Sequence, residues 1–168
     1  MPSSLHGWVG LDETFHDSRC PPRRLHLPAG PGYFSAEVAR SIPAGKLVLV
    51  DIQQEMLDMA RKRLEKNGIV NVECHRADAI SLPFENESFD VAFLVAVLGE
   101  VPDRETCLRE IRRVLRPGGL LSLTEHNLGD PDFIPRGEML NVVQNAGFKL
   151  CARYGISFNY TVNFRKLT

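Results

Sequence analysis

The sequence predicts a doubly wound α/β domain, because from Arg24 onward short apolar runs alternate with stretches of helical periodicity. A glycine turn, Gly30-Pro31-Gly32, follows the first apolar run, and the next apolar run ends in Asp51. Glycines let a ligand approach the backbone, and an acid at the tip of the following strand can accept hydrogen bonds from both hydroxyls of a ribose. The register of these two features predicts a site for a nucleoside.

The first half of the domain is predicted to contain two strands and two helices. Leu25-His26-Leu27 is a short first strand, and apolar residues recur at helical spacing over residues 34–42. The run 47–51 is the second strand. Residues 53–67 place their apolar side chains on one face and stop at Gly68, which is typical of an amphipathic helix and its C-terminal glycine.

Three further strands and a capped helix follow. Residues 70–77 are the third strand, and the run 89–95 is so continuously apolar that we expect it in the middle of the sheet. Asp103 can cap the next helix, which ends where Arg116-Pro117-Gly118-Gly119 breaks the pattern. Residues 120–124 are the fifth strand.

The C-terminal part is predicted to form a helix and a hairpin. Residues 138–145 are helical and end before Gly147, and residues 148–154 are a further strand. Apolar and polar residues alternate over 158–164, which predicts a last strand with one polar face. Because the connection between these strands is short, they should pair as an antiparallel hairpin.

The composition is that of one globular domain. The chain has 168 residues, of which 43% are hydrophobic, and a formal net charge of -1. This charge gives no global basic field, so we expect no nucleic-acid partner. No apolar run approaches the roughly twenty residues of a membrane span, and the N-terminus lacks a signal segment. We expect a soluble, cytoplasmic protein that acts on a small molecule, without a membrane partner.

The cysteines and the N-terminal segment show no functional pattern. The four cysteines are scattered and form no Cys-x-x-Cys pair, so we expect neither a metal site nor a disulfide framework. Cys107 falls on the apolar face of a helix, and Cys74 and Cys151 fall in strands, which favours core packing over a thiol-dependent reaction such as methylation of arsenic. Residues 1–23 lack periodicity and contain three prolines, so we expect an irregular arm before a domain over residues 24–168.

The order of the motifs resembles the class I methyltransferases that use S-adenosyl-L-methionine, over nearly everything from Arg24 to the C-terminus. Residues 115–120, Leu-Arg-Pro-Gly-Gly-Leu, are similar to the characteristic turn before strand five of that family. The resemblance implies a Rossmann-like, doubly wound seven-stranded sheet in the order 3-2-1-4-5-7-6, with the last strand antiparallel. It also implies methyl transfer to a small-molecule acceptor, while the acceptor, any catalytic base and the oligomeric state stay open.

The resemblance also assigns cofactor contacts. The glycine loop would cradle the methionine part of the cofactor, Asp51 would hold the ribose, and Ile52 and Met56 would pack on adenine. Asp78 would accept a hydrogen bond from the adenine amino group, and the backbone at Leu94 would meet the amino group of the methionine part. The complete set of expected cofactor-binding residues is Ala29, Gly30, Pro31, Gly32, Asp51, Ile52, Met56, Asp78, Ala79 and Leu94.

The first strand departs from the family pattern. His26 stands where an acid is expected, and Pro28 stands where the opening glycine is expected. Losing one charge-assisted hydrogen bond costs about 1.5–3 kcal/mol of binding energy. The family also commonly places helices before the first strand, so the short arm predicts an open site. The abrupt change at Ala29 suggests the hypothesis that residues 1 to 28 are not the ancestral segment.

Two other functions are alternatives to methyl transfer. A dinucleotide-binding dehydrogenase would want a third glycine near position 35, where Ser35 stands. A non-catalytic binding or scaffold protein is the leading alternative, because the first motif is altered. Asp51→Ala is expected to abolish cofactor binding and leave the ligand-free thermal midpoint nearly unchanged.

Two acidic positions are candidates for orienting a nucleophile. Glu100 and the pair Glu125-His126 lie beyond the ends of strands four and five, where open α/β sheets place their ligands. The sequence favours the alternative interpretation, that each is a solvated loop charge. His26, in contrast, is expected to be a packed histidine on a buried strand rather than a catalytic base.

Overall fold

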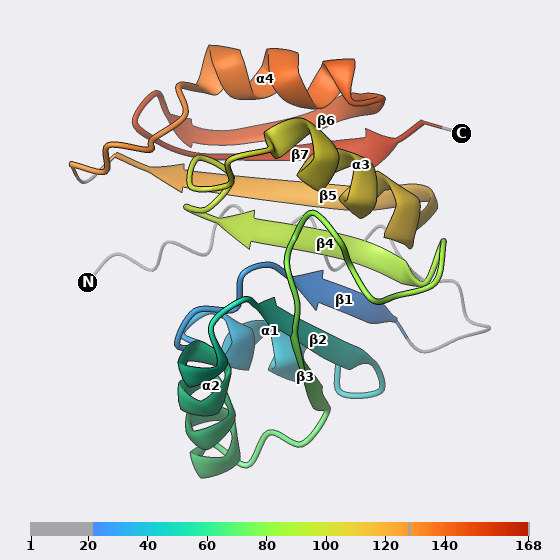
Figure 1. Cartoon of the computed structure of the whole chain (residues 1–168), viewed down its shortest axis with the longest axis vertical. Coiled ribbons are helices and arrows are strands. Elements are labelled where there is room, and N and C mark those ends of the chain that lie inside the picture. The colour runs from blue at the N-terminus through green and yellow to red at the C-terminus, as the bar shows by residue number, and fades with distance from the viewer. Residues whose placement is uncertain (1–21, 128, 168) are drawn as a thin grey trace.

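The computed structural model of the chain describes residues 22–127 and 129–167. Its seven strands form one sheet in the order β3-β2-β1-β4-β5-β7-β6 (Figure 1). All neighbours pair in parallel except β7, which is antiparallel to both β5 and β6. The predicted strand order and the antiparallel hairpin are therefore confirmed.

The elements lie close to the predicted ranges. The strands are β1 (Arg23–His26), β2 (Lys46–Asp51), β3 (Val72–Arg76), β4 (Phe89–Val95), β5 (Leu115–His126), β6 (Phe148–Ile156) and β7 (Asn159–Lys166). The helices are α1 (Ser35–Ser41), α2 (Gln54–Lys66), α3 (Arg104–Val114) and α4 (Arg136–Asn145). β1 begins one residue before the expected domain boundary, and the rest of the expected arm, residues 1–21, lies outside the described residues.

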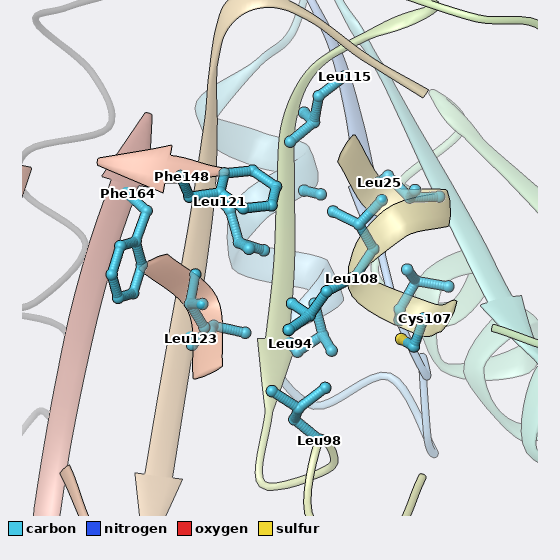
Figure 2. Close-up of a cluster of buried hydrophobic side chains, with 14 of the residues drawn as sticks. Leu25, Leu94, Leu98, Cys107, Leu108, Leu115, Leu121, Leu123, Phe148 and Phe164 are labelled. Atoms are coloured by element: carbon cyan, nitrogen blue, oxygen red, sulfur yellow. The ribbon is translucent and has the colours of Figure 1, made fainter. Parts of the chain in front are cut away.

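Helices cover both faces of the sheet, and each face has its own hydrophobic cluster. Alternate residues of β2 point to opposite faces, so Leu47 and Leu49 pack with α1 and α2, whereas Val48 and Val50 join the other cluster. That second cluster packs α3 and α4 onto β4, β5 and β7 (Figure 2). None of the helices in the described ranges is long and apolar enough to cross a membrane.

The strand β5 begins earlier than the sequence predicts. Residues 116–119 were expected to form a turn between α3 and a strand at 120, but Leu115 already pairs with Phe89. The register then shifts, and pairing resumes between Leu120 and Val91. The Arg-Pro-Gly-Gly segment therefore bulges out of a continuous strand, with Gly118 at a φ of +72°.

On strand β7 the polar side chains of Thr161 and Asn163 are buried, which the alternating pattern did not predict. Thr161 and Asn163 are 7% and 3% exposed. β7 lies between β5 and β6, and the hydroxyl of Thr161 lies 2.9 Å from that of Thr124 on β5. The period-2 pattern predicted the strand, but it did not reveal that both faces of an inner strand are covered.

The prediction that the cysteines pack in the core is correct for only some of them. Cys107 is fully buried, and this burial raises the pKa of its thiol to about 12. Cys74 is half-buried, but Cys151 is exposed on β6, so the expectation of core packing was wrong for Cys151. Among the described residues no group of histidine, cysteine or acidic side chains is arranged to hold a metal ion.

Candidate cofactor site

The carboxyl ends of β1, β2 and β4 meet at one edge of the sheet. The chain leaving β1 passes between the other two strands: the amide of Leu27 donates to the Phe93 carbonyl at 3.1 Å, and the amide of Ala29 donates to the Val50 carbonyl at 2.9 Å. β1 leads to α1 on one side, and β4 leads to α3 on the other. Open α/β sheets bind their ligands at such a switch point.

Two adjoining cavities at this edge form one cleft. The glycine-turn cavity, of about 340 Å³, borders Gly30, and the Asp78 cavity, of about 320 Å³, borders Asp78 and Ala79. Five residues line both cavities and mark their junction: Pro28, Asp51, Ile52, Val97 and Glu100. A single extended ligand can therefore span both.

The two glycines of the turn have different structural roles. Both have positive φ angles, +50° at Gly30 and +77° at Gly32, which other residues rarely adopt. Gly30 lines the cleft, and a Cβ placed there would meet no atom within 4 Å. A Cβ on Gly32 would lie 2.9 Å from the Cβ of Ala60 on α2. Gly30 is thus open to a ligand, whereas Gly32 is buried where the turn packs against a helix.

Asp51 ties the glycine turn to the end of β2. It is only 5% exposed. Its Oδ2 accepts a hydrogen bond from the Gly30 amide at 3.1 Å, and its Oδ1 accepts one from the Gln53 amide at 2.9 Å. The second bond orients the residue before α2, so Asp51 organises the start of the helix while it lines the cleft. Each oxygen keeps a lone pair that a ligand hydroxyl can use.

The Asp78 cavity combines an apolar surface with an acceptor. The Ile52 side chain is 57% exposed and lines the junction. Asp78 lies in the connection after β3, and its Oδ1 accepts a hydrogen bond from the Ile80 amide at 3.1 Å. An exposed apolar side chain beside a carboxylate suits a flat heterocycle with an amino group. Met56, which was expected to pack on adenine together with Ile52, lines the glycine-turn cavity, as Ile52 also does.

His26 is a packed histidine, as expected. It is 2% exposed, stacks on Phe93 with ring centroids 4.1 Å apart, and has its Nδ1 2.9 Å from Oγ of Ser35. Burial lowers its pKa to about 3, so the imidazole is neutral at neutral pH. The first strand therefore brings no charge to the cleft.

The structure separates the two acidic candidates. Glu100 lines both cavities, and its pKa is raised by partial burial and by the nearby Asp130, Asp132 and Asp51. Glu125 is 2% exposed and accepts a hydrogen bond from the Ile134 amide, and burial raises its pKa to about 7. Neither cavity is lined by Glu125 or by its neighbour His126.

Eight of the ten residues expected to hold a cofactor line the cleft: Ala29, Gly30, Pro31, Asp51, Ile52, Met56, Asp78 and Ala79. The other two do not. Gly32 packs on α2, and Leu94 is 2% exposed within the hydrophobic cluster of Figure 2. Any contact of Leu94 with a ligand in the cleft would thus involve its backbone.

Three comparisons with known proteins bear on this site. A family model described as "Methyltransferase domain" matches residues 25–123. The chain belongs to this family. S-adenosyl-L-methionine is the cofactor of the family, and the matched segment contains every residue that lines the two cavities.

Two curated relatives agree with this assignment. The chain is 43% identical over 103 residues to the ubiquinone/menaquinone biosynthesis C-methyltransferase UbiE of Cronobacter sakazakii, covering 60% of this chain and 41% of that protein. It is 38% identical over 96 residues to the demethylmenaquinone methyltransferase of Lactococcus lactis, covering 56% of this chain and 38% of that protein. The chain thus spans about two fifths of the length of these relatives.

The fold matches a solved structure over almost its whole length. A SAM-dependent methyltransferase from Aquifex aeolicus superimposes with a TM-score of 0.84 and 21% identity, covering 99% of this chain and 94% of that one. At this identity the likeness shows the fold. It extends beyond the matched family segment to α4, β6 and β7.

The residues of the cleft fit the cofactor of this family. S-adenosyl-L-methionine carries a sulfonium and an ammonium but no phosphate. The ionisable residues lining the two cavities are the acids Asp51, Asp78 and Glu100, the phenol Tyr33 and the neutral His26, and no lysine or arginine is among the described lining residues. Such a lining favours a cationic ligand over a phosphate-bearing one.

The segment after β4 forms a wall of the cleft that was largely not predicted from the sequence. Val97, Val101 and Pro102 line it together with Glu100. They reach the cleft because Ala96 adopts a positive φ of +51°, which turns the chain at the strand end. Alanine gives no sequence signal for that conformation, so the sequence indicated Glu100 but not Val97, Val101 or Pro102.

Proposed function

We propose that this chain, with residues 24–168 as its catalytic domain, transfers the methyl group of S-adenosyl-L-methionine to a ring carbon of a quinone-like small molecule. The family and the cleft support the transfer. The names of the two curated relatives, a ubiquinone/menaquinone C-methyltransferase and a demethylmenaquinone methyltransferase, support the acceptor class. The observation that carries the proposal is the cleft at the ends of β1, β2 and β4, whose described lining contains three acids and neither lysine nor arginine.

The cofactor is proposed to extend across both cavities. Asp51 at the junction accepts the ribose hydroxyls, and Ile52 and Asp78 hold the adenine. The turn at Gly30 leaves room for the methionine part, with Met56 along the same cavity. This arrangement assigns one part of the molecule to each cavity.

The sulfonium of the bound cofactor supplies an electrophilic methyl group. The protein therefore has to align the acceptor carbon with that methyl group and keep water away. As the carbon–sulfur bond breaks, the methyl group bonds to the ring carbon, which then releases its proton; no described residue is identified as the base that accepts this proton. The segment from Glu125 onward lies outside the matched family segment and is where we expect the acceptor to be selected.

Calorimetric titration and a label-transfer assay test the proposal. The chain should bind S-adenosyl-L-methionine one to one at micromolar concentration. Asp51→Asn should weaken this binding, whereas Asp58→Asn, which changes an exposed acid on α2 that accepts from Gln54, should not. With a demethylated quinol in detergent micelles and tritium-labelled cofactor, the label should appear on a ring carbon.

Each failure has a separate meaning. Absence of binding at millimolar cofactor would overturn the proposed function. Binding without transfer to any quinol would favour the non-catalytic alternative. Label on an oxygen rather than on carbon would reject the proposed site of methylation while leaving the cofactor site intact.

A further inference from the structure

We propose that Glu100 is the specificity residue by which the cleft distinguishes the charged cofactor from its uncharged product, because Glu100 lines both cavities at their junction, where the sulfonium of a bound cofactor would lie. This inference rests on the proposed function. It assigns a role to a residue that the sequence left open between orienting a nucleophile and being a solvated loop charge.

The position of Glu100 follows from the lining of the cleft. Glu100 comes from the turn after β4 and Asp51 from the end of β2, yet both line both cavities. In S-adenosyl-L-methionine the sulfur connects the adenosine part to the methionine part. A molecule with adenine in the Asp78 cavity and methionine in the glycine-turn cavity therefore has its sulfur at the junction, next to the ribose.

Two carboxylates lie at the junction, those of Asp51 and Glu100, and the carboxylate of Glu100 is the one that is still available for a cation. Both oxygens of Asp51 already accept backbone amides, from Gly30 and Gln53. The carboxylate of Glu100 makes no hydrogen bond or ion pair with any of residues 22–127 and 129–167, and its side chain is exposed to the cleft. His26, at the end of β1, is neutral and turned into the core.

The backbone that carries Glu100 is held in place before any ligand arrives. The Glu100 amide donates to the Val97 carbonyl at 2.9 Å, and Nη2 of Arg104 donates to the Gly99 carbonyl at 3.1 Å. Gly99 lies so close to the Asp132 carbonyl that a Cβ there would be 1.8 Å from it. The loop after β5 thus buttresses the turn, and little ordering is required when a cation binds.

The negative charges around Glu100 favour the binding of a cation next to its carboxylate. Asp51, Asp130 and Asp132 repel its carboxylate, and a positive ligand relieves that repulsion. When the methyl group leaves, the carbon–sulfur bond breaks, its electron pair stays on sulfur, and the sulfonium becomes a neutral thioether. The attraction to Glu100 then disappears, so the product should be held less tightly than the cofactor.

The test compares ligands that differ at the sulfonium position, where two carry a positive charge and one is neutral. Calorimetry on the full chain should show that Glu100→Gln raises the Kd of S-adenosyl-L-methionine about tenfold and changes the Kd of S-adenosylhomocysteine less than threefold. Sinefungin, which carries an amine at the sulfonium position, should lose affinity as the cofactor does. Asp58→Asn is the matched control, because it removes an exposed charge on α2 that lines neither cavity, and it should leave both dissociation constants unchanged. Glu100→Asp should restore part of the discrimination.

The outcomes separate this inference from the proposed function. Equal losses for cofactor and product would mean that Glu100 contacts a part that both share, and unchanged affinities would mean that it contacts neither. Either result overturns the inference while leaving cofactor binding established. An unsubstituted chain that binds none of the three ligands would overturn the proposed function itself. Thermal midpoints of the variants should match that of the unsubstituted chain, because Glu100 is exposed.

Discussion

The amide of Gly30 donates a hydrogen bond to Oδ2 of Asp51 at 3.1 Å, so the glycine turn after β1 and the acid after β2 are held as one unit. The same carboxylate accepts the Gln53 amide at 2.9 Å. Asp51 is therefore part of the scaffold of the cleft as well as part of its lining.

This double role changes the expectation for Asp51→Ala. The sequence suggested loss of binding with an unchanged thermal midpoint, but removal of a 5% exposed acceptor leaves two amides without their partner. We predict that the ligand-free chain loses about 1–3 kcal/mol of unfolding free energy, in addition to its cofactor affinity. Urea unfolding without ligand measures the first effect and calorimetry the second. An unchanged urea midpoint would contradict the two hydrogen bonds.

The two glycines of the turn should respond differently to alanine. Gly32→Ala would place a Cβ 2.9 Å from the Cβ of Ala60 and would also strain the φ of +77°, so it should destabilise the fold by about 2–5 kcal/mol. A Cβ at Gly30 has open space around it, so Gly30→Ala should cost only the backbone strain of its positive φ, about 1–2 kcal/mol. Gly30→Ala should nevertheless reduce cofactor affinity more strongly than Gly32→Ala does. Thermal melts and titrations of both variants give the comparison. A larger stability loss at Gly30 would reverse the assignment.

The buried His26 should make the fold sensitive to acid. Its pKa in the folded chain, about 3, lies below the ordinary 6.5, so below pH 6.5 the unfolded chain binds a proton that the folded chain does not. The free energy of unfolding should therefore fall by about 1.4 kcal/mol per pH unit between pH 6.5 and pH 3 from this residue alone. His26→Asn removes this slope. Urea midpoints of both chains from pH 8 to pH 5 measure it, and parallel curves would contradict the prediction.

Glu125 should act in the opposite direction. Its folded pKa, about 7, lies above the ordinary 4.5, so its contribution is fully present below pH 4.5 and is lost as the pH rises to 7. Glu125→Gln keeps an acceptor for the Ile134 amide without a charge and should raise the unfolding free energy at pH 8 by about 1–3 kcal/mol.

The two slopes oppose each other between pH 4.5 and pH 6.5. The unsubstituted chain should therefore show a flatter profile there than either single variant. Denaturant unfolding at pH 5, 6.5 and 8 provides the measurement. A Glu125→Gln chain that is no more stable than the unsubstituted chain at pH 8 would show that burial does not penalise this carboxylate.

The fold could be predicted because local signals agree with the global arrangement. The continuous apolar run of β4 requires cover on both faces, which places it inside the sheet, and Asp103 caps α3 by accepting the Thr106 amide at 2.9 Å. The turn at residues 116–119 was misjudged because a glycine pair signals a break in direction, whereas a partner strand decides whether pairing continues around it.

The sequence by itself determined the glycine turn and the acids Asp51 and Asp78, which lie around one cleft, and its resemblance to a known family implied the strand order. Only the tertiary structure decided which acid after the later strands reaches that cleft. Glu100 and Glu125 look alike in sequence, but Ala96 turns the chain after β4 toward the cleft, whereas β5 continues and the segment near Ile134 covers Glu125. Local composition specifies strands and turns, whereas the burial of a side chain depends on which distant segments pack over it.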